Sequence, residues 1–118
     1  MSIEFSTTTQ ATTTGPVLAF VGELDSSTAP TAHDTIRQLT IGAGDQLVVD
    51  LTGLTFCDSS GIAALIAARD FAHRAGGEIA LAAVPRHLGK VLGLLGLADL
   101  FATHPTAAQA QQAWAGRH

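Results

Sequence analysis

This chain of 118 residues has one cysteine, no tyrosine and few aromatic side chains, which make up 5% of its residues. A single cysteine excludes an internal disulfide and is typical of a reducing compartment, so we expect a cytoplasmic protein. Few aromatic rings leave little for bases to stack on. With only six Lys and Arg residues and a formal net charge of −4, the chain is not expected to bind nucleic acid directly, because a phosphate backbone attracts a basic surface.

Long apolar runs are also missing. No stretch approaches the ~18 apolar residues that a membrane span needs, and residues 1–5 lack the basic and apolar regions of a secretory signal. The chain is nevertheless 47% apolar, which suits a packed core, and its length predicts one domain over residues 1–118. Small size and negative charge favour a monomer or a weak dimer.

The apolar residues follow two periodicities. Short apolar runs predict strands, and apolar residues at spacings of three and four predict helices between them. The expected strands are 3–6, 17–21, 47–51, 78–84 and 100–102, and the threonine-rich stretch 7–14 should form strand ends around a turn at Gly15-Pro16. The expected helices begin near residues 28, 59, 85 and 106. This order predicts an α/β fold with a mixed central sheet of about five strands and about four helices packed against it.

The most informative segment is Asp58-Ser59-Ser60-Gly61, which follows a buried apolar run and begins a helix. Asp and Ser side chains commonly cap helices, so capping alone would explain the segment. A cap needs only one hydroxyl, however, and the second is surplus. A helix N-terminus also favours a phosphate, because its free N–H groups and its dipole attract negative charge. The serines therefore act either as caps or as functional hydroxyls.

The helix that begins at this motif has no charged residue from Ser59 to Ala68. A surface helix usually carries charge on its outer face once per turn. Ala63, Ala64, Ala67 and Ala68 cannot all point inward, so part of this smooth face should be exposed. Our hypothesis is that it docks another protein.

Two aspartates each follow a predicted strand. Asp25 comes after the strand 17–21, and Asp58 comes after the apolar run that starts at Leu47. The loops beyond the ends of strands in an open α/β sheet gather at one edge. The two carboxylates either flank the serine pair there or are ordinary turn aspartates.

Catalytic and metal sites are not indicated. The chain lacks the Gly-x-Ser-x-Gly elbow that exposes a nucleophilic serine, and its histidines are too dispersed for a triad or a zinc site. Cys57 lies at an apolar strand end, where it should act as a small buried hydrophobe. The glycines at 89, 93 and 96 fall in or at the end of a helix, unlike those of a phosphate loop. We expect no enzyme, no metal and no cofactor.

Three stretches follow one another along the chain: Gly22-Glu23-Leu24-Asp25 with Thr28-Ala29-Pro30, then 49–61 with its Asp-Ser-Ser-Gly, then 91–97 with Leu100-Phe101. In this order, and over residues 17–113, the chain resembles the STAS domain. More narrowly, it is similar to the free-standing anti-sigma factor antagonists of bacteria.

That resemblance implies a partner-switching function. An unphosphorylated antagonist binds an anti-sigma factor that is also a serine protein kinase, and so releases a sigma factor. The kinase phosphorylates a serine of the motif, implied here to be Ser60 with Ser59 as the alternative, and a PP2C-type phosphatase removes the phosphate. The expected partner-binding residues are Asp25, Asp58, Ser59, Gly61, Ala63, Ala64 and Ala67.

STAS domains also serve in lipid-transport complexes, in ligand-binding sensors and in the tails of anion transporters. An accessory subunit of a transport complex is therefore the first alternative that the resemblance implies, and it would need no phosphorylation. A small-molecule sensor is the second.

Overall fold

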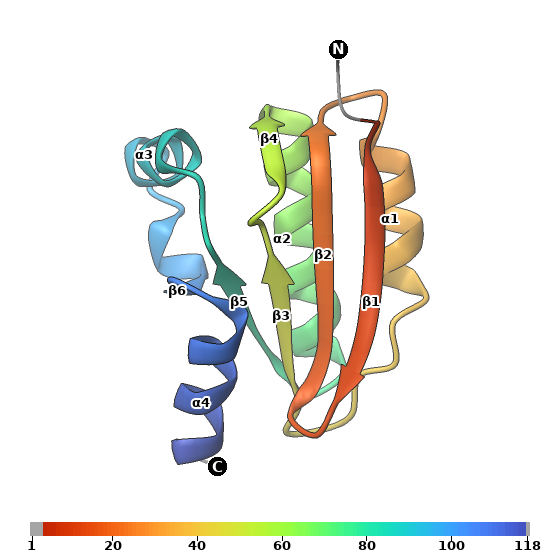
Figure 1. Ribbon diagram of the computed structural model, residues 1–118, viewed down its shortest axis with the longest axis vertical. Helices are drawn as coiled ribbons and strands as arrows, with labels where there is room; N and C mark the ends of the chain where they lie inside the picture. The colour runs from red at the N-terminus through yellow and green to blue at the C-terminus, as the bar shows by residue number, and fades with distance from the viewer. Residues whose placement is uncertain (1–3, 118) are drawn as a thin grey trace.

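A six-stranded sheet with helices on both faces organises residues 4–117, the part of the chain that the computed structural model describes (Figure 1). In chain order the elements are β1 (Ser6–Thr12), β2 (Gly15–Leu24), α1 (Ala29–Arg37), β3 (Gln46–Asp50), β4 (Leu54–Cys57), α2 (Ser59–Arg74), β5 (Glu78–Ala82), α3 (Arg86–Leu94), the 3-10 helix η1 (Ala98–Leu100), β6 (Ala102–His104) and α4 (Ala107–Arg117). The predicted α/β class, with a mixed sheet and four α-helices, is confirmed.

The sheet has the strand order β1-β2-β3-β5-β6, and β4 pairs with β2. Only β1 runs antiparallel to its neighbour β2; the other pairs are parallel. Because β3 and β4 pair with successive parts of β2, β4 extends the sheet beyond the end of β3. The short strand β4 thus carries the chain to the start of α2.

The predicted strand 47–51 corresponds to β3, but the apolar run that begins at Leu47 continues into a further strand, β4, which was not predicted. The carboxylate of Asp50 accepts hydrogen bonds from the N–H (3.0 Å) and hydroxyl (2.6 Å) of Thr52, and this turn separates β3 from β4. A Cβ on Gly53 would lie 2.9 Å from Cγ2 of Val21, so only glycine lets the turn pack against β2. The sheet therefore has six strands rather than about five.

The threonine-rich stretch forms a strand rather than only strand ends. In β1 it pairs along its whole length with β2, from Ser6 opposite Val21 to Thr12 opposite Gly15. β-branched threonine suits such a half-buried pleated surface. Ile3, where the first strand was predicted to begin, lies outside the described residues. The last strand also begins later than predicted, because residues 98–100 form η1.

The core lies mainly between the sheet and the helices α1 and α2. Its largest fully buried side chains are Phe20, Leu18, Leu24, Leu47, Leu51, Leu65, Leu81 and Val49. The opposite face of the sheet presents small residues to α4, whose Ala110 packs against Val48, Ala80 and Ala82. The large cluster holds α2 firmly against the sheet and so fixes the position of its N-terminus.

Candidate partner-binding site

The first turn of α2 is capped by Asp58. One oxygen of its carboxylate accepts hydrogen bonds from the N–H groups of Ser60 (2.9 Å) and Gly61 (3.2 Å). Within residues 4–117, the hydroxyls of Ser59 and Ser60 form no hydrogen bond. Because the aspartate supplies the whole side-chain cap, neither hydroxyl is needed to begin the helix.

Gly61 allows α2 to approach β2 closely. A Cβ on Gly61 would lie 2.5 Å from Sγ of Cys57 and 2.8 Å from the carbonyl oxygen of Leu24. Gly61 is buried, and one helical turn further Ala64 is buried completely. The prediction that these two residues contact a partner is therefore wrong for direct contact, since both face the core.

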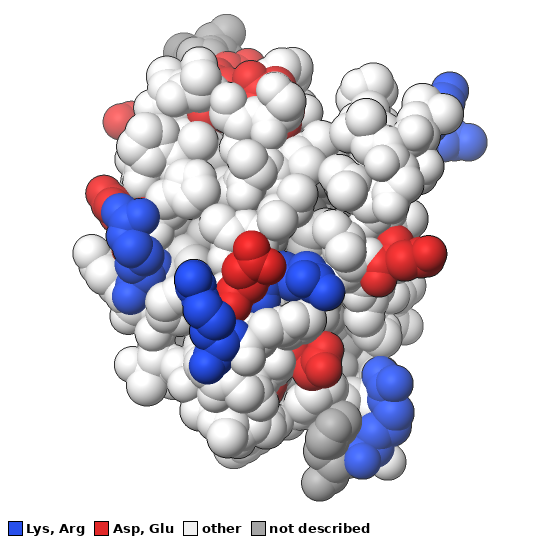
Figure 2. All heavy atoms as spheres, turned by 180° about the vertical axis from the view of Figure 1, so that it is seen from behind, with Lys and Arg blue, Asp and Glu red and all other residues white. Residues whose placement is uncertain are grey.

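The exposed part of the uncharged helix face is narrower than predicted. Ala63 is exposed and Ala67 is half-buried, whereas Ala68 is fully buried. Figure 2 shows the molecule from the side that α2 covers: the middle of its upper part is white, acidic side chains lie at its upper edge and basic ones at the upper right, and a band of Lys, Arg, Asp and Glu crosses it lower down. The available surface therefore consists of Ser59, Ala63 and Ala67, with Ser60 half-buried beside them.

Asp25 forms the turn between β2 and α1. Its carboxylate accepts hydrogen bonds from the hydroxyl (2.6 Å) and N–H (2.9 Å) of Ser27 and from the N–H of Thr28 (3.2 Å). The Ser27 hydroxyl is the largest influence on the pKa of Asp25, which lies below its ordinary value because these donors outweigh desolvation. Thr28 precedes α1, but its side chain does not cap the helix, because its hydroxyl donates to the carbonyl of Glu23 (2.8 Å).

The two aspartates lie at the same edge of the sheet. Leu24, the last residue of β2, is paired with Cys57, the last residue of β4, and the N–H of Asp58 donates to the carbonyl of Leu24 (3.3 Å). Asp25 and Asp58 therefore follow two paired residues on neighbouring strands, which lie about 4.8 Å apart. The strand pairing thus brings Asp25 to the sheet edge where the serine pair begins α2, while each carboxylate accepts hydrogen bonds within its own turn.

Cys57 is half-buried and packs against the core. Burial is the main reason that the pKa of its thiol rises to about 11, and the neighbouring carboxylate of Asp58 adds to the effect. The thiol is thus protonated at neutral pH and donates weakly to the carbonyl of Asp58 (3.7 Å). This environment is that of a packing residue rather than a nucleophile, as predicted for Cys57.

Comparison with known proteins shows which family the chain belongs to. A family model described as "Mlab, STAS domain" matches residues 7–102. The chain belongs to this family of STAS domains. The family resemblance seen in the sequence is confirmed, and the matched region extends from β1 to the start of β6.

Solved structures share the whole fold of this STAS domain. An anti-sigma factor antagonist from Mycobacterium paratuberculosis is 25% identical, with a TM-score of 0.82 over 96% of this chain and 97% of that chain. The unphosphorylated form of the anti-sigma factor antagonist SpoIIAA is 20% identical, with a TM-score of 0.73 over 94% and 97% of the two chains. The phosphorylated form of Bacillus SpoIIAA is 19% identical, with a TM-score of 0.67 over 92% and 97%.

One exposed feature of this STAS domain was not predicted from its sequence. Phe56 of β4 has 51% of its surface exposed and borders a hollow of about 230 Å³, whose lining also includes Pro85, His87 and Leu88. No local pattern identifies it, because the opposite walls come from β4 and α3, which are about thirty residues apart in the chain. Only the exposed aromatic residue two positions before Asp58 could have served as a signal.

Neither a metal-binding cluster nor a membrane-spanning helix occurs in the part of the chain that the structure describes. Among residues 4–117, no group of three or more His, Cys, Asp and Glu side chains is arranged to hold a metal ion. None of the helices in the same range has the length and apolar character needed to cross a membrane.

Proposed function

We propose that this STAS domain is an anti-sigma factor antagonist that works in the cytoplasm by binding rather than by catalysis. In its unphosphorylated form it binds an anti-sigma factor with serine kinase activity and thereby releases a sigma factor. The observation that carries the proposal is the N-terminus of α2, where Asp58 provides the cap and leaves two serine hydroxyls without a structural task. The similarity to the Mycobacterium antagonist over 96% of this chain supports the same function.

The kinase modifies Ser60, or alternatively Ser59. Ser60 has the position that the family motif implies, directly before Gly61. Ser59 is the more exposed of the two, since Ser60 is half-buried. Asp25 and Asp58, on either side of this pair, contribute to recognition by the kinase and by the PP2C-type phosphatase that removes the phosphate.

Phosphorylation works through charge. A phosphoserine adds roughly −1.5 to −2 charges. A helix N-terminus stabilises such a charge, but two N–H groups of this first turn already bind the carboxylate of Asp58, so the stabilisation is only partial. In a docked complex the phosphate would be desolvated near the carboxylates of Asp58 and Asp25, which is unfavourable for a group of the same charge. Binding to the anti-sigma factor therefore weakens while the fold persists.

The first test is phosphopeptide mapping of the protein recovered from its own cells with phosphatases inhibited. Cleavage after Arg37 and Arg69 yields the peptide 38–69, which holds both candidate serines. The expected result is a single phosphoryl group on Ser60 or Ser59. An unmodified peptide under several growth conditions would contradict the proposal.

The second test compares variants as baits for the anti-sigma factor. We expect Ser60→Ala to retain the partner permanently and Ser60→Asp to bind it poorly. Ser26→Ala is the matched control, because Ser26 is exposed in the adjacent turn. The same Ala and Asp substitutions are also made at Ser59. If the Ala and Asp variants capture equal amounts of the anti-sigma factor at both positions, the charge mechanism is refuted.

The alternative function is that of an accessory subunit in a transport complex. Leu94 and Leu95 favour it, because they leave 78% and 59% of their surfaces exposed at the end of α3 and such apolar surface is typical of permanent assemblies. This reading predicts no phosphoserine in the peptide 38–69 and a stable complex with a transport protein whichever residue occupies position 60.

A further inference from the structure

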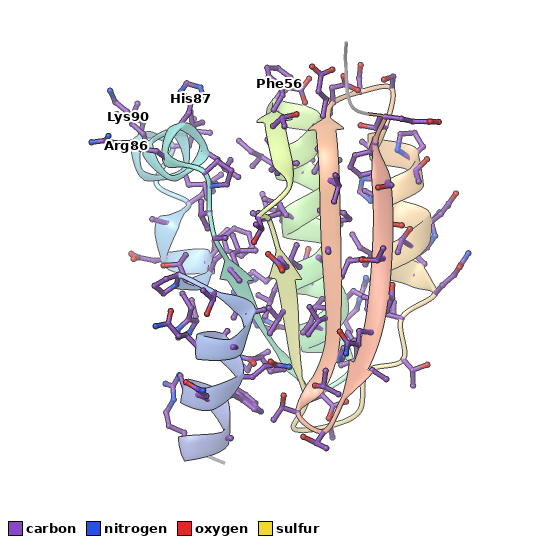
Figure 3. All side chains as sticks on the ribbon, viewed as in Figure 1. Phe56, Arg86, His87 and Lys90 are labelled. Carbon is purple, nitrogen blue, oxygen red and sulfur yellow. The ribbon has the colours of Figure 1, made fainter. Side chains whose placement is uncertain are left out.

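Helix α3 carries an isolated basic surface on an acidic protein. Its Arg86 and Lys90 are exposed, and within residues 4–117 neither forms a salt bridge. No acidic residue occurs between Glu78 and Asp99, although the whole chain has a net charge of −4. Figure 3 shows Arg86, His87 and Lys90 on α3 at the same end of the molecule as Phe56.

The hollow between α3 and β4 is apolar and small. Phe56 and Leu54 form part of one wall, Pro85 and Leu88 form part of the other, and His87 lies at the side of α3. Its volume of about 230 Å³ is below the range of about 300–1,000 Å³ that is usual for small-molecule sites. A single bulky side chain from another protein is the occupant that fits its size and lining.

The hollow lies close to the serine site along the chain. Phe56 and Cys57 both line it, and the chain passes from Cys57 through Asp58 directly into Ser59. A protein that covers the serines and extends toward α3 therefore meets the hollow first and the two cations after it. Acidic groups are expected on that part of the partner, because an unpaired Arg and Lys complement carboxylates.

We propose that the anti-sigma factor reaches this surface with an acidic segment, which places one bulky apolar side chain in the hollow and carboxylates opposite Arg86 and Lys90. This inference rests on the proposed function and extends its interface from α2 across β4 to α3. An anionic bilayer fits the surface less well, because two cations contribute only about 1 kcal/mol each on a membrane and the hollow recedes from a flat surface.

The test measures the affinity of the purified anti-sigma factor, identified by capture on the Ser60→Ala bait, for variants of the full chain. We expect Phe56→Ala to weaken binding about tenfold, as is typical of a central aromatic anchor. Arg86→Glu with Lys90→Glu should weaken it by a similar factor in about 0.05 M salt and by less in about 0.3 M salt, because salt screens charges. Arg74→Glu with Arg117→Glu makes the same charge change on exposed residues elsewhere and should leave the affinity unchanged.

The outcomes separate the two proposals. If no anti-sigma factor is captured, the proposed function fails and this inference fails with it. If Ser60→Asp weakens binding while the Phe56 and α3 variants do not, only this inference is overturned. A third outcome concerns membranes. The domain could sediment with phosphatidylcholine–phosphatidylglycerol vesicles and lose this binding in the double variant of Arg86 and Lys90, while its affinity for the anti-sigma factor stays unchanged. That result would assign the surface to a membrane and likewise overturn this inference.

Discussion

Substituting Gly61 with alanine tests the close approach of α2 to the sheet. The added Cβ would lie 2.5 Å from Sγ of Cys57, 2.8 Å from the carbonyl oxygen of Leu24 and 3.0 Å from its Cγ. The thiol can rotate away, but the carbonyl oxygen is held in place because it accepts a hydrogen bond from the N–H of Asp58. The substitution must therefore displace the first turn of α2 or the end of β2.

The expected cost combines two opposing effects. Overpacking a well-packed site costs about 1–3 kcal/mol, whereas replacing glycine with alanine in a helix gains about 1 kcal/mol. Since the closest backbone contact cannot yield, the overpacking cost should lie in the upper part of its range, at about 2–3 kcal/mol, and we expect a net destabilisation of about 1–2 kcal/mol for Gly61→Ala. Gly93 provides the matched control, because it also lies in a helix but a Cβ there would meet no atom within 4 Å. Gly93→Ala should therefore stabilise the protein by up to about 1 kcal/mol.

Urea unfolding followed by far-ultraviolet circular dichroism measures both variants against the wild type. The expected midpoints fall in the order Gly93→Ala, wild type, Gly61→Ala, with unchanged slopes, because the surface exposed on unfolding stays the same. A Gly61→Ala variant as stable as the wild type would refute the packing of α2 against Leu24 and Cys57. A loss of stability in Gly93→Ala would refute the assumption that helix propensity alone decides that position.

Three further predictions concern the capping and titratable groups. Asp58→Ala should lower the free energy of unfolding by about 1 kcal/mol in urea titrations, because it removes the helix cap, and Asp58→Asn should restore most of the loss. The Cys57 thiol should react with iodoacetamide at pH 7.5 roughly a hundredfold more slowly in the folded protein than in the urea-unfolded chain. The reason is that a pKa of about 11 rather than 9.0 leaves less of the reactive thiolate. Equal rates would contradict the burial of this thiol. The pKa of Asp25, lowered mainly by the Ser27 hydroxyl, should rise in Ser27→Ala when followed by NMR. Because the folded-state pKa is depressed, the stability from this carboxylate is present above its unfolded pKa and is lost as the pH falls through the folded value, so Asp25→Asn should flatten the acid limb of the stability profile.

The elements that follow local rules were predictable from the sequence. The start of α2 at Ser59 is encoded by Asp58, whose capping bonds reach only two and three residues along the chain. The helix α3 follows from the spacing of Leu88 and Leu92, both of which are buried. In each case the decisive interaction lies within one or two helical turns, so the local pattern carries enough information.

The errors concern contacts between distant segments. The strand β4 after the turn at Thr52 and Gly53 was not predicted, because this turn packs against Val21 of β2 and β4 pairs with β2, far away in the chain. The alanines of α2 look equivalent in the sequence, yet Ala64 is fully buried and Ala63 is exposed. Which side of an uncharged helix faces the sheet depends on the core that it meets.

The sequence by itself determined the α/β class, the cap at Asp58, the presence of two serines at a helix start and the resemblance to STAS domains. These features rest on residue types and on spacings of a few residues, which one chain segment specifies alone. Only the tertiary structure decided that Asp25 shares the sheet edge at which the serines begin α2, that Gly61 faces the core, and that Phe56 and α3 enclose a hollow. Each of these features depends on strand pairing or helix packing between segments far apart in the chain. Segments with the same local pattern can pack together in different ways, so the pattern alone does not decide them.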